Sequence, residues 1–282
     1  MTSALQIALT VGIGGFGAII GSFLNVVIWR VPRGESLLPA SHCPACDAAI
    51  RPWQNVPVLS WIALRGRCAS CRAKISVRYP LVEFATGLAF AAVTWWSVTS
   101  AVSAHVIGAS PAAAVAVWLA LAAYLWFAAA SITLTMIDLE HRRLPTAIVA
   151  PTGIVVGALL TAAALLTQDW PRLVSTLSGS AILFALYLVI ALIAPRGIGG
   201  GDVKLAPVLG APLGFLGWGA LAVGGFAGFL LGALAGLVLI AAGRATRRTA
   251  LPFGPFMLAG AWIGLVAGPW LMTAYLSLWA VG

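Results

Sequence analysis

The chain consists of long apolar runs separated by short polar connections. Seven runs reach the about 20 residues that a helix needs to cross a bilayer, and they lie at 4–29, 81–102, 112–137, 147–167, 173–194, 219–242 and 255–279. An eighth segment, 203–218, is shorter and contains Pro207, Pro212 and several glycines. The pattern predicts an all-α polytopic membrane protein with about eight transmembrane helices. In this interpretation 203–218 is a short span, and a re-entrant hairpin is the alternative.

Composition supports this class. Only 8% of the residues are charged and 61% are hydrophobic, whereas a soluble domain usually has about 25% charged residues. The first basic residue is Arg30, so the first run lacks the positive start of a secretory signal and is expected to be a retained span. The net charge of +9 would suggest nucleic acid if it formed one solvated face. The basic residues instead lie in short clusters between apolar runs, so we expect no nucleic-acid partner.

The basic residues also predict the orientation, because Lys and Arg accumulate in cytoplasmic loops. With eight spans and the N-terminus outside, the inner segments are 30–80, 138–146, 195–204 and 243–251. These segments contain every Lys and Arg of the chain except Arg172. Asp138 and Asp202 are then expected to lie on the cytoplasmic face, together with the segment 30–80. A re-entrant 203–218 would reverse the orientation of everything after it.

The segment 30–80 contains all four cysteines in two C-x2-C pairs: Cys43, Cys46, Cys68 and Cys71. Two such pairs match a four-cysteine zinc site, in which each pair forms one edge of a tetrahedron. Two disulfides are the alternative, which a reducing cytosol disfavours. About fifty residues bury little core, and a metal ion stabilises modules of this size. We therefore expect a small cytoplasmic insert with a structural zinc, between the first and second helices.

Two series of glycines predict closely packed helices. Gly17 and Gly21 are four residues apart in the first run, and four further glycines repeat at the same spacing in a later run: Gly224, Gly228, Gly232 and Gly236. Small residues at this spacing let helix backbones approach closely in lipid. Packing within one chain is the favoured interpretation, and a dimer interface is the alternative.

Two acidic residues are candidates for chemistry, because ionisable groups at the ends of membrane spans are costly and often functional. Asp138 closes the third run, and Asp202 follows the three glycines 199–201. Close carboxyl groups do not both ionise easily and can share a proton. The ionised group can then take a proton from water while the protonated one polarises a peptide carbonyl. The glycines can give the backbone a positive φ and let a substrate strand approach.

Structural roles are the alternative for these acids. Asp138 can cap a helix or pair with Arg142 or Arg143, and Asp202 can pair with Lys204. A third acid, Glu83, lies at the start of the second run. We expect it to cap that helix or to pair with a nearby arginine.

Several segments resemble, in the same order, those of the type IV prepilin peptidases, a family of membrane-embedded aspartic proteases. "GGGDVK" resembles the family signature GxGDxK, and "MIDLEHRRLP" is similar to the segment of its first aspartate. The other similar segments are "GSFLNVVIWRVPRG", the paired CxxC insert, "GRCASCRAKISVRYPLVE" and "LPFGPFMLAGA". The resemblance covers nearly the whole chain.

The resemblance implies that Asp138 and Asp202 are the catalytic pair, supported by Gly199, Gly201 and Lys204. It implies removal of the short basic leader of prepilins and pseudopilins at the cytoplasmic side of the bacterial inner membrane. Members with the cysteine-rich insert typically also N-methylate the new N-terminal residue with S-adenosylmethionine, and this activity would fall on residues 21–80. Many members have Asp where this chain has Thr146, and Thr can also cap a helix start.

The expected domain organisation is a first helix at 1–29, the insert at 30–80 and a seven-helix protease domain at 81–282. Two other classes of function remain as alternatives. A transporter could use intramembrane acids to carry protons or cations, but it predicts acids near the midplane and an inverted repeat. A zinc-stabilised assembly scaffold would need no paired acids. The position of both acids at the inner ends of spans favours the protease.

Overall fold

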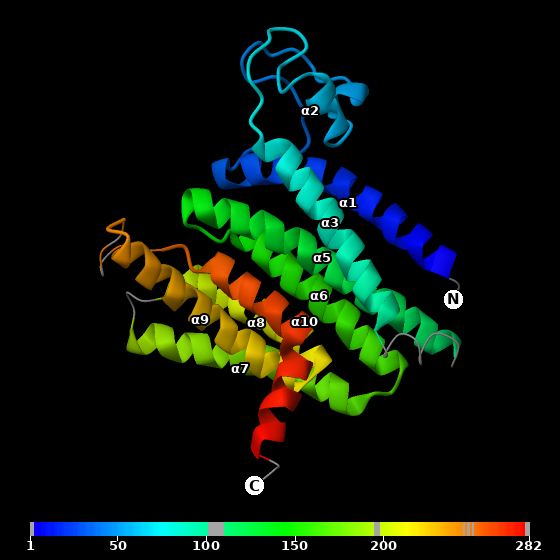
Figure 1. Ribbon diagram of the computed structural model, residues 1–282, viewed down its shortest axis with the longest axis vertical. Helices are drawn as coiled ribbons and strands as arrows, with labels where there is room; N and C mark the ends of the chain where they lie inside the picture. Colours follow the sequence, from blue (N-terminus) through cyan, green and yellow to red (C-terminus); the bar gives the residue numbers. More distant parts are fainter. Residues whose placement is uncertain are drawn as a thin grey trace. The chain divides into compact units, whose positions relative to one another are not determined.

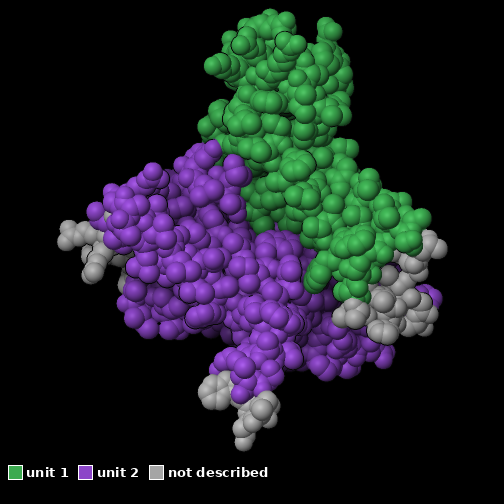
Figure 2. Space-filling model, in the orientation of Figure 1, with its two compact units in different colours: residues 1–106, 128–133 green, residues 107–127, 134–282 purple. Residues whose placement is uncertain are grey.

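The computed structural model describes residues 3–100, 110–194, 198–244, 246, 249 and 251–279. Within these residues, seven helices are long and apolar enough to cross a membrane. They coincide with the seven predicted runs, so the all-α polytopic class is confirmed. The chain forms two compact units, residues 1–106 with 128–133 and residues 107–127 with 134–282 (Figure 2). Three basic residues used to predict the orientation lie outside the described residues: Arg196, Arg247 and Arg248.

In the first unit, α1 (Ser3–Arg30) and α3 (Arg78–Thr99) pack side by side (Figure 1). A β-carbon built on Gly21 would lie 2.7 Å from Cα of Glu83, and one on Gly17 would lie 2.6 Å from Cβ of Phe90. These distances are too short for a side chain, so the two helices approach this closely because α1 has glycine at both positions. The expected close packing within the chain is confirmed for this pair.

The insert between α1 and α3 contains only short helices: η1 (Val31–Arg33), η2 (Pro52–Asn55) and α2 (Leu59–Ala63). It is attached to α3 by Glu83, which is 8% exposed and accepts a 2.7 Å hydrogen bond from the backbone N–H of Val58. Val58 has φ 62°, which is unusual for a β-branched residue. The expectation that Glu83 caps its own helix is wrong, because it lies five residues inside α3 and holds the residue before α2 instead.

The second unit contains α5 (Pro111–His141) except for its residues 128–133, together with five further helices: α6 (Thr146–Leu166), α7 (Trp170–Ile193), α8 (Gly200–Leu216), α9 (Trp218–Ala241) and α10 (Gly254–Trp279). Its most extensive contacts are between α9 and α10 and between α7 and α8. A β-carbon on Gly224 would lie 3.3 Å from Cα of Gly264, and one on Gly228 would lie 3.2 Å from Cα of Met257. The glycine series of α9 therefore packs against α10 of the same chain, as expected.

The eighth predicted segment is one continuous helix, α8, that is buried along most of its length. The carbonyls of its two internal prolines accept hydrogen bonds from neighbouring helices, Pro207 from Ser180 Oγ at 2.9 Å and Pro212 from Tyr124 Oη at 3.2 Å. Gly217, with φ 113°, ends the helix. A re-entrant hairpin within 203–216 is therefore excluded. A helix of 17 residues is about 26 Å long, so α8 is a short element by membrane standards.

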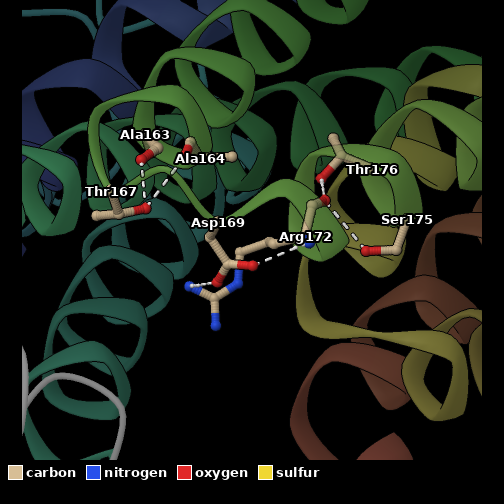
Figure 3. A network of polar contacts seen from close by, with 7 residues as sticks. All are labelled: Ala163, Ala164, Thr167, Asp169, Arg172, Ser175 and Thr176. Atoms are coloured by element: carbon tan, nitrogen blue, oxygen red, sulfur yellow. Dashed lines mark hydrogen bonds and ion pairs between the residues drawn. The ribbon is translucent and has the colours of Figure 1, made fainter.

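Hydrogen bonds and an ion pair stabilise the short connection between α6 and α7 (Figure 3). Asp169 Oδ1 accepts from the backbone N–H of Arg172 at 3.0 Å, and its Oδ2 lies 3.4 Å from Arg172 Nη1. Thr167 Oγ1 donates to Ala163 O at 3.0 Å, a carbonyl at the end of α6 that also accepts the backbone N–H of Thr167 at 3.3 Å. The short connection lets α6 and α7 form a hairpin that returns the chain to the end of the unit at which α6 began.

Candidate functional site

Asp138 lies in the last turn of α5 and is 4% exposed. Its Oδ2 accepts a 3.1 Å hydrogen bond from the backbone N–H of Gly254, the first residue of α10. The carboxyl group therefore lies at the N-terminus of a helix from the far end of the sequence. The first N–H groups of a helix have no partner inside it, and the helix dipole favours a negative charge there.

Asp202 also accepts a hydrogen bond from a backbone N–H group at the start of a helix, in this case α8. It is the third residue of α8, is 9% exposed, and its Oδ2 accepts from the backbone N–H of Gly199 at 3.0 Å. The expectation that glycines 199–201 adopt a positive φ is wrong, since none of the three does. Gly199 matters for its small size instead, because a β-carbon at this position would lie 3.3 Å from Asp202 Oδ2.

Leu144, in the connection between α5 and α6, lies next to Gly201, which precedes Asp202, and next to Gly254, which holds Asp138. A β-carbon on Gly201 would lie 3.1 Å from Leu144 Cβ, and one on Gly254 would lie 3.1 Å from Leu144 Cδ2 and 2.8 Å from Asp138 Oδ2. The charge of Asp138 acts on the carboxyl group of Asp202. The end of α5 and the starts of α8 and α10 thus converge on one buried pair of acids.

The two acids form no ion pair with a Lys or Arg among the described residues. Lys204 Nζ donates to Thr146 Oγ1 at 3.1 Å instead. The ion-pair alternative for the acids is therefore wrong, whereas the capping alternative stated for Asp138 describes its Oδ2. The capping contact of Asp202 Oδ2 with Gly199 was not predicted. The expected capping role of Thr146 is also wrong, since Pro145 is the N-cap residue of α6 and no side chain caps it.

An aromatic cluster lies next to the acids. The ring of Tyr187 in α7 stacks on that of Phe229 in α9 at 5.1 Å, and Phe229 contacts Phe253 at 5.5 Å. Tyr187 is 2% exposed and interacts electrostatically with Asp202. Phe253 directly precedes Gly254, so the cluster fixes the start of α10 that holds Asp138.

Three residues of this site were not found from the sequence: Leu144, Tyr187 and Gly254. Gly254 belongs to the segment "LPFGPFMLAGA", which resembled the family but had no role assigned. The resemblance of that segment could have pointed to Gly254 as a site residue. Its contact with Asp138 could not be read from a local pattern, because the two residues are 116 positions apart.

The four cysteines of the insert form a second site. One sulfur atom from each of Cys43, Cys46, Cys68 and Cys71 lies within 4.8 Å of all the others, and the Sγ atoms of Cys43 and Cys71 are 3.9 Å apart. Four sulfurs bound to one zinc at about 2.3 Å would be roughly 3.8 Å apart. All four cysteines are free, so the disulfide alternative is wrong. Their arrangement fits a tetrahedral metal ion.

Each CxxC pair is held in a similar turn. Cys43 N–H donates to Ala48 O at 2.9 Å, and Cys68 N–H donates to Ala73 O at 2.8 Å. The residue after each second cysteine, Asp47 or Arg72, has a left-handed φ of 58° or 61°. This repeated turn was not predicted, although both cysteine pairs have the same C-x2-C spacing. In the second turn, backbone hydrogen bonds from Cys71 and Ser70 lower the pKa of the Cys68 thiol to about 6, which favours the thiolate form that binds metal.

Two family models match the chain, and their ranges include the residues of the two sites. The family model of the bacterial peptidase A24 N-terminal domain matches residues 16–97, which include the cysteines. That of the type IV leader peptidase family matches residues 125–241, which include Asp138 and Asp202.

Three of the similar proteins are prepilin leader peptidase/N-methyltransferases. The one from Stutzerimonas stutzeri is 34% identical over 93% of this chain and 91% of its own length. Those from Pseudomonas putida and Neisseria gonorrhoeae are each 33% identical over 93% of this chain, and 92% and 90% of their own lengths are covered. No solved structure matches the chain.

Proposed function

Because the chain belongs to the type IV leader peptidase family, we propose that it is a prepilin leader peptidase and N-methyltransferase. It is a multi-pass protein of the inner membrane. It removes the short basic leader of prepilins and pseudopilins, and it methylates the amino group that cleavage exposes. The observation that carries the peptidase activity is the buried pair of carboxyl groups at the meeting point of α5, α8 and α10.

The geometry supports an aspartic mechanism with Asp138 and Asp202 as the catalytic pair. Each acid uses Oδ2 to hold a helix N-terminus, and in the described residues its hydrogen bonds involve that oxygen alone. One carboxylate takes a proton from water as the water oxygen attacks the scissile carbonyl carbon, and the protonated partner donates to the carbonyl oxygen. The tetrahedral intermediate then loses the amine, which leaves with a proton. Gly199 and Gly201 leave room for the Asp202 carboxyl group and for Leu144.

The cytoplasmic side is part of the proposal. It rests on the distribution of Lys and Arg, which accumulate in the segments assigned to the inner face. A prepilin has a basic leader followed by an apolar helix, and the junction between them lies at the membrane surface. Acids at the ends of helices, rather than in their middles, reach that junction without unwinding a helix inside the bilayer.

Isosteric substitutions test the catalytic pair. Asp138→Asn and Asp202→Asn keep an oxygen that accepts the bond from the helix N-terminus, but they remove the acid. We expect each variant to insert normally and to lose leader cleavage by at least about a thousandfold. Asp169→Asn is the matched control, because Asp169 also caps a helix, at the far end of the α6–α7 hairpin. The measurement is mass spectrometry of a prepilin incubated with each purified enzyme, and full processing by either variant would refute the assignment.

We also propose that the cysteine site holds a structural zinc ion, bound by Cys43, Cys46, Cys68 and Cys71. Four thiolates leave no open position for water, so the metal would stabilise the insert and supply no catalysis. Cys43→Ser should lower the zinc content of the purified protein to background and should lower methylation more than cleavage. Unchanged zinc content would contradict the ligand assignment.

The methyl transfer is assigned to residues 21–80, with S-adenosylmethionine as the methyl donor. The support is the name of the relatives together with the match of the N-terminal family model to this region. Mass spectrometry of the new N-terminus reports cleavage and methylation separately in one sample. Cleaved but unmethylated product from the unaltered enzyme, with the donor present, would reject the second activity alone.

A further inference from the structure

A groove of about 320 Å³ lies along α6 and α8, and Ser180 of α7 also lines it. Its walls are apolar and include Val149 and Ala150 from α6 and Pro207 and Val208 from α8. The hydroxyl group of Ser180 already donates to the carbonyl of Pro207. Most of the groove therefore offers apolar surface and few free hydrogen-bonding groups.

One end of the groove is polar and positive. Lys204 and Thr146 line it there, and Lys204 Nζ donates to Thr146 Oγ1 at 3.1 Å. Lys204 lies in the first turns of α8, and Thr146 is the first residue of α6. Both helices begin at this end, and the partial positive charge of a helix N-terminus adds to that of the lysine. The residues that line the groove include no Asp or Glu.

The size of the groove restricts its occupant. One turn of an α-helix, about 5.4 Å long and 10–12 Å across, occupies roughly 500 Å³, which is more than the groove holds. An extended peptide would bring backbone N–H and C=O groups into a place with few partners for them, which is costly in a membrane. A hydrocarbon chain has the right thickness and needs no hydrogen bonds.

We propose that this groove binds one anionic phospholipid, with an acyl chain between α6 and α8 and the phosphate on Lys204 and Thr146. A lysine binds phosphate as a point charge, and the hydroxyl group of Thr146 adds a donor when the lysine turns to the lipid. The same pair of residues links the start of α6 to the start of α8, the helix that carries Asp202. A bound phosphate would strengthen that link from outside the pair of acids.

The test measures lipid binding and not processing, so its outcome is independent of the proposed enzymatic function. The purified full-length protein is titrated in detergent with dioleoylphosphatidylglycerol or dioleoylphosphatidylcholine, and bound lipid is counted by native mass spectrometry. We expect one saturable site that prefers the anionic lipid. Lys204→Gln should weaken phosphatidylglycerol binding about fivefold, the effect of one lysine near an anionic lipid surface, and should weaken the binding of zwitterionic phosphatidylcholine less, so that the preference for the anionic lipid decreases.

A matched pair of variants tests the position of the acyl chain. Ala150→Phe fills the groove and should abolish the saturable site, whereas Ala147→Phe makes the same change on an exposed part of α6 outside the groove and should leave it intact. Equal affinity for the two lipids, or unchanged binding by Ala150→Phe, would overturn the proposal. Displacement of the lipid by an added prepilin would also overturn it, because the groove would then be a substrate site.

Discussion

Gly254→Ala is the sharpest test of how the acids are positioned. Gly254 donates its backbone N–H to Asp138 Oδ2, and a β-carbon at this position would lie 2.8 Å from that same oxygen. It would also lie 3.1 Å and 3.3 Å from the two δ-carbons of Leu144. Non-bonded atoms normally stay about 3.5 Å apart, so the carboxylate has to move by roughly half an ångström or more.

The expected cost follows from that movement. The hydrogen bond from Gly254 to a carboxylate contributes about 1.5–3 kcal/mol, and each 1.36 kcal/mol of lost transition-state stabilisation lowers a rate tenfold. We therefore expect the rate constant of leader cleavage to fall by about 10- to 100-fold. Alanine does not weaken a helix relative to glycine. A loss of rate would thus report the position of Asp138 and not the stability of α10.

The assay is cleavage of a purified prepilin under single-turnover conditions, with thermal unfolding measured on the same samples. Gly157→Ala is the matched control, because a β-carbon on Gly157 in α6 would meet nothing within 4 Å. We expect this control to keep its rate within about twofold. If Gly254→Ala also keeps its rate within about twofold, the position of the Asp138 carboxylate does not control the reaction and the reasoning is refuted.

Two further predictions concern the first unit. Gly21→Leu should destabilise the protein by about 1–3 kcal/mol, because the new side chain would collide with α3. Gly12→Leu is the control and should not destabilise it, because a β-carbon on Gly12 would meet nothing within 4 Å. Equal unfolding temperatures of the two variants would contradict the close packing of α1 and α3. Glu83→Gln should weaken the hold on Val58, and hydrogen exchange around α2 should become faster. The exposed Glu35→Gln is its control, and identical exchange in both variants would show that Glu83 does not fix the insert.

The helices of this protein were predictable because the bilayer imposes their length and composition. Each of the seven long runs became a helix at nearly the predicted residues. The cysteine site was predictable for a related reason, since metal coordination requires each pair to be local in sequence. Gly17 and Gly21 were informative because few contacts other than helix packing require small residues at that spacing.

The details of the acid site could not be predicted, because they depend on contacts between distant segments. Asp138 and Gly254 are separated along the described chain by the helices α6, α7, α8 and α9, and no local pattern records their contact. Thr146 was expected to cap α6 because its residue type is typical of caps, but Lys204 engages its hydroxyl group. Glycines 199–201 were expected to be needed for their backbone angles, whereas the structure favours small residues at 199 and 201 because little space surrounds them.

The groups that hold the two acids in place are peptide N–H groups and not side chains. Every residue except proline has such a group, so mutation at position 199 or 254 rarely removes the donor itself. The orientation of the two acids therefore depends on the path of the main chain and on the small size of residues 199 and 254, and not on a hydrogen-bonding side chain.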